Sequence, residues 1–223
     1  MGAAVERHLL GEDEIAALAG LAARVRDLAG AAVVTGAGSA EAAAVAAEVE
    51  ALTARLMAER RDAPPYAASA EIGGAPSGGA ESGRGRRMDR QVGNPVTGPL
   101  NPVAPPVDLE VTSDGIVRGE FTLGDVYEGP PSYAHGGVSA MVLDQVLGMA
   151  AAATGTPGMT ANLELRYRRP TPLHVPLLVE AKASRVEGRK VYAAGTIAAP
   201  DGRVTVEATA MFVMPQRFVT SQY

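Results

Sequence analysis

Residues 135–153 read HGGVSAMVLDQVLGMAAAA, and this stretch decides the fold. It is apolar almost throughout and is followed by Gly155 and Pro157, residue types that end helices. Its length is marginal for a membrane span and Asp144 lies near its middle, so a buried helix over residues 137–153 is the better interpretation. A helix that is apolar on nearly every side needs cover on most sides. We therefore expect the rest of the core to wrap around it.

The segments before and after this helix show the alternation and the turn signals of β-strands. Two short strands come first, joined by the hairpin turn Ser113-Asp114-Gly115. More strands follow the helix, and we expect them to form a meander. The expected strands are residues 107–112, 116–123, 159–168, 177–186, 190–199 and 204–214. Together these elements predict an α+β core, one antiparallel sheet wrapped around a long central helix.

The first strand after the helix, residues 159–168, alternates regularly between apolar and polar residues. One face is expected to carry Met159, Ala161, Leu163, Leu165 and Tyr167. The other face is expected to carry Thr160, Asn162, Glu164, Arg166 and Arg168. We interpret the polar set as a solvated sheet face, with contacts to the phosphates of a bound carrier as the alternative.

The N-terminal region is Ala-rich and is expected to form two helices within residues 12–62. Residues 36–39 break the helical pattern, and the second helix is expected to span about residues 39–61. Its larger apolar residues lie on one side: Val45, Val49, Leu52 and Leu56. We expect this pair of helices to pack on something else rather than to fold alone.

Residues 64–106 are rich in Gly, Pro and Ser and have no evident period, which indicates a linker. Its last part, residues 94–106, predicts an ordered but irregular entry to the core. A basic cluster inside the linker is interpreted as solvated, with a clamp for a phosphorylated ligand as the alternative: Arg84, Arg86, Arg87 and Arg90. The chain is thus divided into a helical extension (1–63), this linker, the core (107–214) and a C-terminal tail (215–223).

Composition excludes several classes of function. The 223 residues carry a net charge of -5, which gives no general electrostatic reason to bind nucleic acid. The absence of cysteine excludes disulfides, thiolate metal sites and a cysteine nucleophile. The three histidines, His8, His135 and His174, are scattered, so no dedicated metal site is expected. The first residues carry acids and no long apolar run, so we expect a cytoplasmic protein without a secretory signal.

The start of the central helix carries the candidate chemistry. His135, Gly136 and Gly137 open the helix, where the first N–H groups have no partner within the helix. Such donors suit a carbonyl oxygen that becomes negative during a reaction. Asp144 lies two turns beyond Gly137 on the same side, and a carboxylate in a mostly apolar setting is a candidate general base or nucleophile. A tight loop-to-helix turn and a locally bonded buried acid are the structural alternatives.

At these residues the chain resembles the hotdog-fold thioesterases of the PaaI-like group, and most closely their carboxyl-terminal modulator protein branch of acyl-CoA thioesterases. Three matching pieces stand in the same order: HGGVSAMVLDQVLG at 135–148, MTANLELRYRRPTPL at 159–173 and VEGRKVY at 186–192. The resemblance spans about residues 103–214 and leaves the N-terminal helices and most of the linker uncovered. It implies a hotdog fold, with an N-terminal helical extension added to it.

The resemblance also implies the roles of the site residues. His135, Gly136 and Gly137 would shape the oxyanion site, with the Gly137 N–H polarising the thioester carbonyl. Asp144 of a second subunit would activate water or attack the carbonyl directly, and Thr160 would help to place the water. The activity implied is hydrolysis of acyl-CoA to a carboxylic acid and CoA.

Coenzyme A would be held by four arginines: Arg166, Arg168, Arg185 and Arg189. The resemblance implies a homodimer or a dimer of dimers, with active sites at the subunit interface. It implies no cofactor beyond the coenzyme A of the substrate, and the net charge of -5 predicts no nucleic-acid partner. The alternatives are a non-catalytic acyl-CoA-binding protein, a hotdog hydratase or dehydratase, and a scaffold acting through the N-terminal helices. The acyl chain and the choice between CoA and a carrier protein stay open.

Overall fold

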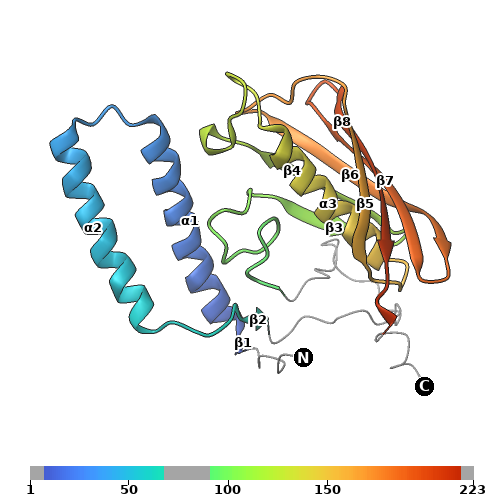
Figure 1. Cartoon of the computed structure of the whole chain (residues 1–223), viewed down its shortest axis with the longest axis horizontal. Coiled ribbons are helices and arrows are strands. Elements are labelled where there is room, and N and C mark those ends of the chain that lie inside the picture. The colour runs from blue at the N-terminus through green and yellow to red at the C-terminus, as the bar shows by residue number, and fades with distance from the viewer. Residues whose placement is uncertain (1–7, 68–90, 217–223) are drawn as a thin grey trace.

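The computed structural model describes residues 8–67 and 91–216, and its centre is an antiparallel sheet wrapped around helix α3, Gly136–Ala152 (Figure 1). The sheet has six strands in the order β3-β4-β6-β7-β8-β5. Their bounds are β3 Asp108–Val111, β4 Ile116–Thr122, β5 Met159–Tyr167, β6 Pro176–Glu187, β7 Lys190–Ala198 and β8 Val204–Val213. The predicted sheet around a central helix is therefore confirmed.

The strands that follow α3 do not form the simple meander that we expected. Strands β6, β7 and β8 are consecutive neighbours, but β5 pairs with β8 and forms the far edge of the sheet. Helix α3 occupies the inner face, so the chain that leaves it re-enters the sheet at the edge beside β8. Residues 168–175 then return the chain to β6, which pairs with β4 in the middle of the sheet.

The core lies between α3 and the inner face of the sheet. Six residues of α3 are fully covered: Val142, Leu143, Val146, Leu147, Ala150 and Ala151. The strands oppose them with inward side chains that include Val117, Phe121, Leu177, Val179, Ile197, Val206 and Phe212. Each such aliphatic or aromatic side chain contributes about 1.5–3 kcal/mol by leaving water, so this layer holds α3 in place.

The N-terminal region forms the two predicted helices, α1 (Glu12–Val34) and α2 (Ser39–Ala58). The N-cap of α2 is Gly38, and α2 ends three residues before the predicted Arg61. Strands β1 (Leu9–Leu10) and β2 (Tyr66–Ala67) pair in parallel and close the base of this helical hairpin.

Helix α1 lies between α2 and the sheet domain (Figure 1) and packs on the short 3-10 helix η1, Asp125–Tyr127. The Arg26 guanidinium donates to the carbonyl oxygens of Ala104 at 2.9 Å and Asn101 at 3.1 Å. Helix α1 is thereby fastened to the segment that enters the core, whereas α2 contains no buried residue.

The described part of the expected linker, residues 91–106, is ordered and irregular. The Asn94 side-chain oxygen accepts from the backbone N–H of Val96 at 2.7 Å and of Thr97 at 3.0 Å, which fixes a turn. Val92, Val96 and Ala104 are buried. The arginine cluster at Arg84, Arg86, Arg87 and Arg90 lies outside the described residues.

No helix within residues 8–67 and 91–216 has the length and apolar character to cross a membrane. In the same ranges, no group of three or more His, Asp or Glu residues is arranged to hold a metal ion.

Truncating the core side of α3 tests this packing. Leu147→Ala removes a side chain that is 0% exposed, so we expect the free energy of unfolding to fall by about 2–5 kcal/mol in urea titrations of the full chain. Leu178→Ala is the matched control, because Leu178 is 48% exposed, and its effect should stay within about 0.5 kcal/mol. Equal losses for the two variants would contradict the assignment of Leu147 to the core.

Candidate active site

The first turn of α3 is capped by His135. The Gly137 N–H donates to His135 Nδ1 at 3.0 Å, and the His135 carbonyl oxygen accepts from the Val138 N–H at 2.9 Å. The His135 N–H in turn donates to the Tyr127 carbonyl oxygen at 2.8 Å, which ties the cap to η1. An accepting Nδ1 places the imidazole proton on Nε2 in this arrangement.

Two aromatic rings explain why glycines open the helix. A Cβ at Gly136 would lie 3.2 Å from the ring of Tyr167, whose hydroxyl donates to the Gly136 carbonyl oxygen at 3.0 Å. A Cβ at Gly137 would lie 3.1 Å from His135 Nδ1. Sequence reasoning missed Tyr167. The available signal was its place at the end of a strand that follows the helix, on the face expected to be apolar.

The backbone donor that we expected to be open is occupied in this structure. We predicted that the Gly137 N–H would face a ligand, but it is bonded to the His135 ring. Within the part of the chain that the structure describes, the Gly136 N–H has no hydrogen-bond partner. The open donor at the N-terminus of α3 is therefore Gly136, and Gly137 becomes available only when the imidazole turns away.

Asp144 is held by a hydroxyl from the sheet. Thr160 Oγ1 donates to Asp144 Oδ1 at 2.9 Å, so the half-buried carboxylate is fixed from β5. The partly exposed residues Met141, Asp144 and Gly148 follow Gly137 at helical spacing. They form a stripe along α3 that the sheet does not cover.

A β-bulge aims Thr160 at this carboxylate. Thr160 pairs with Phe212 and Asn162 pairs with Met211, so Ala161 is an extra residue in β5. We predicted that Thr160 and Asn162 would share a face, and this is wrong. The bulge turns Thr160 to the side of α3, together with Leu163 and Leu165, and leaves Asn162 on the outer face.

One chain does not bring the oxyanion donors and the carboxylate together. Seven residues separate Gly137 from Asp144, which is about 10 Å along the helix axis. A general base and an oxyanion donor each need to lie within about 3 Å of the atoms they serve. A thioester held by the first turn of α3 is therefore beyond the reach of Asp144 in the same chain.

A second polar link lies next to Asp144. Asn94 Nδ2 donates to Gln145 Oε1 at 3.1 Å and fastens the irregular entry segment to the middle of α3. Sequence reasoning did not single out either residue. The contact joins residues 51 apart, and no local pattern encodes it.

The predicted coenzyme A contacts lie on the outer face of the sheet in two separate places. Arg166 and Arg168 lie at one end of β5, whereas Arg185 and Arg189 lie at the β6–β7 turn. Arg166 and Arg185 are four residues apart along the strands and three strands apart across them, about 20 Å in all. A single chain therefore does not gather the four arginines into one cluster.

Three of these arginines have partners. Arg168 pairs with Glu207 at 2.7 Å and holds the pKa of that carboxyl below its ordinary value. Arg185 stacks on the ring of Tyr192 at 4.1 Å. Arg189 Nη1 donates to the Met214 carbonyl oxygen at 2.9 Å. Arg166 forms no hydrogen bond or ion pair with any residue in 8–67 or 91–216, so its guanidinium is the one most available to a ligand.

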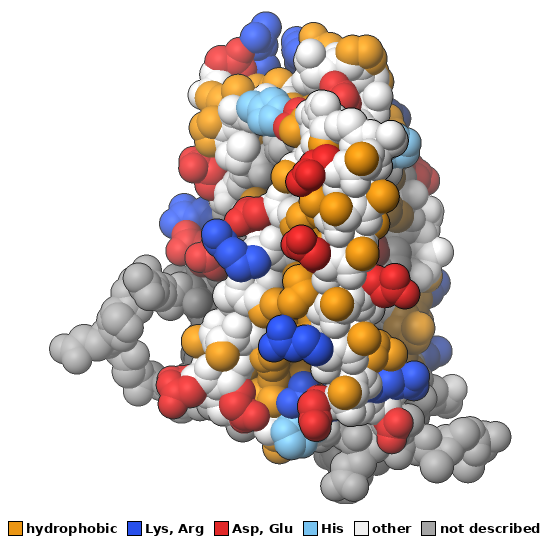
Figure 2. All heavy atoms as spheres, turned by 90° about the vertical axis from the view of Figure 1, so that its left-hand side faces the viewer, with side chains coloured by type: hydrophobic (Ala, Val, Ile, Leu, Met, Phe, Trp, Pro, Cys, Tyr) orange, Lys and Arg blue, Asp and Glu red, His pale blue; other side chains and the backbone are white. Residues whose placement is uncertain are grey.

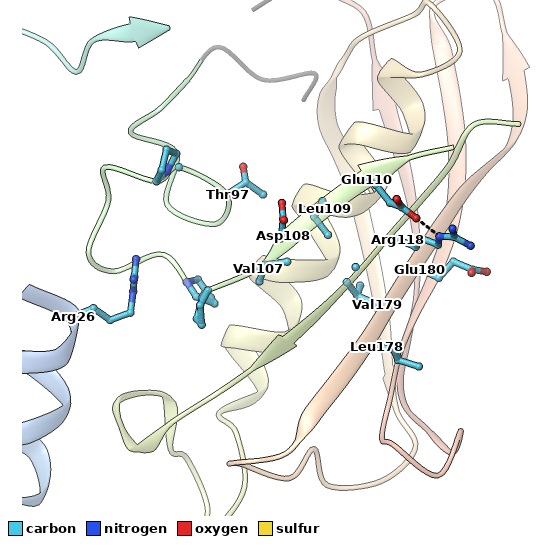
Figure 3. Close-up of a pocket in the computed structure, with 15 residues that line it drawn as sticks. Arg26, Thr97, Val107, Asp108, Leu109, Glu110, Arg118, Leu178, Val179 and Glu180 are labelled. Atoms are coloured by element: carbon cyan, nitrogen blue, oxygen red, sulfur yellow. Dashed lines mark hydrogen bonds and ion pairs between the residues drawn. The ribbon is translucent and has the colours of Figure 1, made fainter. Parts of the chain in front are cut away.

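A cavity of about 1120 Å³ lies away from Asp144, between the entry segment, β3, β4 and β6 (Figure 3). Three carboxylates line it: Asp108, Glu110 and Glu180. Of its two cations, Arg118 pairs with Glu110 and Arg26 donates to backbone carbonyls. This lining does not favour a polyanion such as coenzyme A.

Comparisons with known proteins agree with this architecture. The family model described as Thioesterase superfamily matches residues 132–213, which include the helix cap, Asp144 and Thr160. The crystal structure of protein RHA08564, a thioesterase superfamily protein, is 40% identical, covers 88% of this chain and 94% of that chain, and has a TM-score of 0.73. This chain belongs to the thioesterase superfamily. The hotdog fold that the motifs implied is thereby confirmed.

Curated relatives match a shorter part of this thioesterase superfamily member. Acyl-coenzyme A thioesterase THEM4 of Xenopus laevis is 37% identical over 94 residues, which are 42% of each chain. THEM4 of Mus musculus is 37% identical over 87 residues, 39% of this chain and 37% of the relative. The chain thus spans about two fifths of the length of the curated relatives it matches. These relatives form the carboxyl-terminal modulator protein branch that the motifs indicated, so this resemblance is confirmed too.

The cap at His135 can be tested directly. His135→Ala removes the acceptor for the Gly137 N–H and should lower the free energy of unfolding by about 1 kcal/mol. His135→Asn keeps a capping oxygen and should recover most of that loss. Nitrogen-15 NMR of the wild-type imidazole should show the proton on Nε2. A spectrum with the proton on Nδ1 would be incompatible with the cap.

Proposed function

We propose that this protein is an acyl-CoA thioesterase, which hydrolyses acyl-CoA to a free carboxylic acid and CoA. The observation that carries the proposal is the Asp144 carboxylate, fixed at 2.9 Å by Thr160 on the uncovered stripe of the central helix. The similarity to proteins named acyl-coenzyme A thioesterase supports the same chemistry. A role in lipid metabolism and a location in the cytoplasm stay predictions from the sequence.

The catalytic site is proposed to form between two copies of the chain. One copy supplies the first turn of α3, with His135, Gly136 and Gly137, and the other supplies Asp144 with Thr160. The separation of about 10 Å within one chain supports this division. Strand β5 is an edge of the sheet, so its outer hydrogen-bonding groups are open to pairing with a second copy. A dimer that pairs there also places its two copies of Thr160 near the shared edge.

In the proposed reaction, the thioester carbonyl oxygen accepts from the Gly136 N–H and, once the His135 ring has turned, from the Gly137 N–H. Asp144 removes a proton from water as the water oxygen attacks the carbonyl carbon, and Thr160 orients the carboxylate. Collapse of the tetrahedral intermediate breaks the C–S bond, and the CoA thiolate leaves and takes up a proton. Direct attack by Asp144 to form a mixed anhydride is the alternative. A single turnover in ¹⁸O-water tests the alternative, because a product without ¹⁸O requires an anhydride whose Asp144 carbonyl is attacked by water. ¹⁸O in the product means that water attacked the acyl carbon.

Replacing the carboxylate tests this mechanism. Asp144→Asn keeps the shape and the Thr160 contact but removes the base or nucleophile, so kcat should fall by at least about 100-fold with the melting temperature unchanged. Asp108→Asn is the matched control, because Asp108 is an exposed carboxylate on β3. This variant should keep full activity. Near-normal hydrolysis by Asp144→Asn would refute the mechanism. Retained acyl-CoA binding by a wild-type chain that hydrolyses none of a broad panel of esters would instead favour the non-catalytic binder.

The occupied Gly137 N–H is the observation that favours this second candidate, because a donor capped by His135 is closed to the carbonyl. A binder needs no oxyanion donor, whereas an esterase needs the ring to move. The retained Asp144–Thr160 pair argues the other way, since a pure binder has no use for a carboxylate beside a thioester.

Recognition of the nucleotide part of coenzyme A is proposed to depend most on Arg166, with Arg168, Arg185 and Arg189 as further contacts. Arg166→Gln removes the one guanidinium of the four that has no hydrogen bond or ion pair among the described residues. It should raise KM for acyl-CoA several-fold, about 1 kcal/mol, with little change in kcat. The same variant should hydrolyse the matching acyl-pantetheine thioester, which lacks the nucleotide, as well as the wild type does. Arg203→Gln serves as the control, because Arg203 is an exposed arginine paired with Asp201. Equal changes in KM for acyl-CoA and for acyl-pantetheine would contradict a contact between Arg166 and the nucleotide.

A further inference from the structure

Helix α1 has two apolar faces, and only one of them is fully used. Residues Ala22 and Arg26 lie on the face that packs on η1 and the entry segment. Leu21, Val25 and Leu28 lie on another face, about 110° away around the helix. Their side chains remain 39%, 38% and 40% exposed. Helix α1 therefore carries apolar side chains that the rest of the described chain leaves largely uncovered.

Helix α2 carries a matching apolar stripe, the α2 seam, made of Val45, Val49, Leu52 and Leu56. The successive spacings of four, three and four residues are those of a coiled-coil seam. Val49 is the only residue of α2 that is not exposed. Val45, Leu52 and Leu56 nevertheless remain 39%, 51% and 54% exposed. Figure 2 shows hydrophobic side chains along this flank of the molecule, with acidic and basic side chains among them.

The α2 seam is complementary to itself in an antiparallel arrangement. When two copies of α2 run in opposite directions about a centre between Glu50 and Ala51, Val49 of one copy lies opposite Leu52 of the other. Val45 then lies opposite Leu56 in the next layer. A two-fold axis through this centre repeats each contact, as a symmetric dimer requires.

The charges beside the seam select the same arrangement. Glu48 and Arg55 occupy equivalent positions one heptad apart, next to the seam, and both are exposed. Neither forms an ion pair with a residue in 8–67 or 91–216. In the antiparallel arrangement, Glu48 of each copy lies beside Arg55 of the other, which gives two symmetric pairs. A parallel pair would place Thr53 beside Glu48 and leave both charges without a partner.

We infer that the α1–α2 hairpin is an interface for a second copy of this chain, in which two hairpins form an antiparallel four-helix arrangement. The occupant is a copy of the chain because the seam and its flanking charges complement themselves. A lipid surface is a poorer match, because helices that lie on membranes carry mostly Lys and Arg on their polar face, whereas α2 also carries Glu41, Glu48 and Glu50. This interface is separate from the β5 edge and does not depend on the proposed enzymatic activity.

A charge exchange tests the arrangement in the full chain. Glu48→Arg or Arg55→Glu alone places like charges opposite each other twice, so each should raise the dissociation constant of this contact about tenfold in sedimentation velocity. The double variant restores the pairs with reversed sign and should return to within about threefold of the wild type. Glu50→Arg makes the same charge change away from the seam and is the control. A double variant that is no better than the single ones would overturn the inference.

The apolar contact and its register need separate measurements. Leu52→Glu should halve the mass of the assembly in light scattering while the melting temperature stays near that of the wild type, because Leu52 is exposed in one copy. The chain has no cysteine, so a mixture of Val49→Cys and Leu52→Cys chains should form an intermolecular disulfide faster than either variant alone. An unchanged mass for Leu52→Glu overturns the inference. The inference is also overturned if the wild-type chain sediments with phosphatidylglycerol vesicles and Leu52→Glu abolishes that binding without changing the mass of the assembly. That result would assign the seam to lipid.

Discussion

Helix α3 is apolar on nearly every side, and the sheet domain is arranged to cover it. The sheet covers the side that bears Val142, Leu143, Val146 and Leu147, which are 0% exposed. The entry segment and η1 cover parts of the remainder through Asn94 and through the His135 cap. The stripe through Met141, Asp144 and Gly148 is left partly open within one chain. The carboxylate lies on the side of the helix that the fold leaves uncovered, which is where a ligand or a second copy can reach it.

The position of Asp144 would have little value without a donor to fix it. A charged carboxylate near an apolar helix costs free energy unless it is hydrogen-bonded. The donor is Thr160, and it reaches the helix because Ala161 adds one residue to β5. In a regular strand, Thr160 and Asn162 would point the same way. One inserted residue thus lets β5 keep Leu163 and Leu165 in the core and still present a hydroxyl to the carboxylate.

Much of the fold could be predicted from the sequence, because burial and alternation are local signals. The bounds of α3 and of the six strands of the large sheet agree with the expected ranges to within one residue at every end. Strand order could not be predicted in the same way, because alternation is the same whichever edge a strand joins. The motifs pointed to Asp144 and Thr160, but the contact between them depends on the bulge. Tyr167 and Asn94 were missed because their partners, Gly136 and Gln145, lie 31 and 51 residues away.

The α1–α2 hairpin, like α3, leaves apolar side chains uncovered within one chain. A sheet domain of this kind satisfies its own core, yet α2 buries no residue and still keeps a regular apolar seam. Apolar side chains at a strict spacing are a cost in an exposed helix, because water must order around them and the helix gains nothing in return. The same helix carries oppositely charged residues one heptad apart beside the seam, Glu48 and Arg55. The seam is therefore better understood as half of a contact than as the outside of a finished domain. The stripe of α3 through Met141, Asp144 and Gly148 is likewise a surface that a ligand or a second copy can complete.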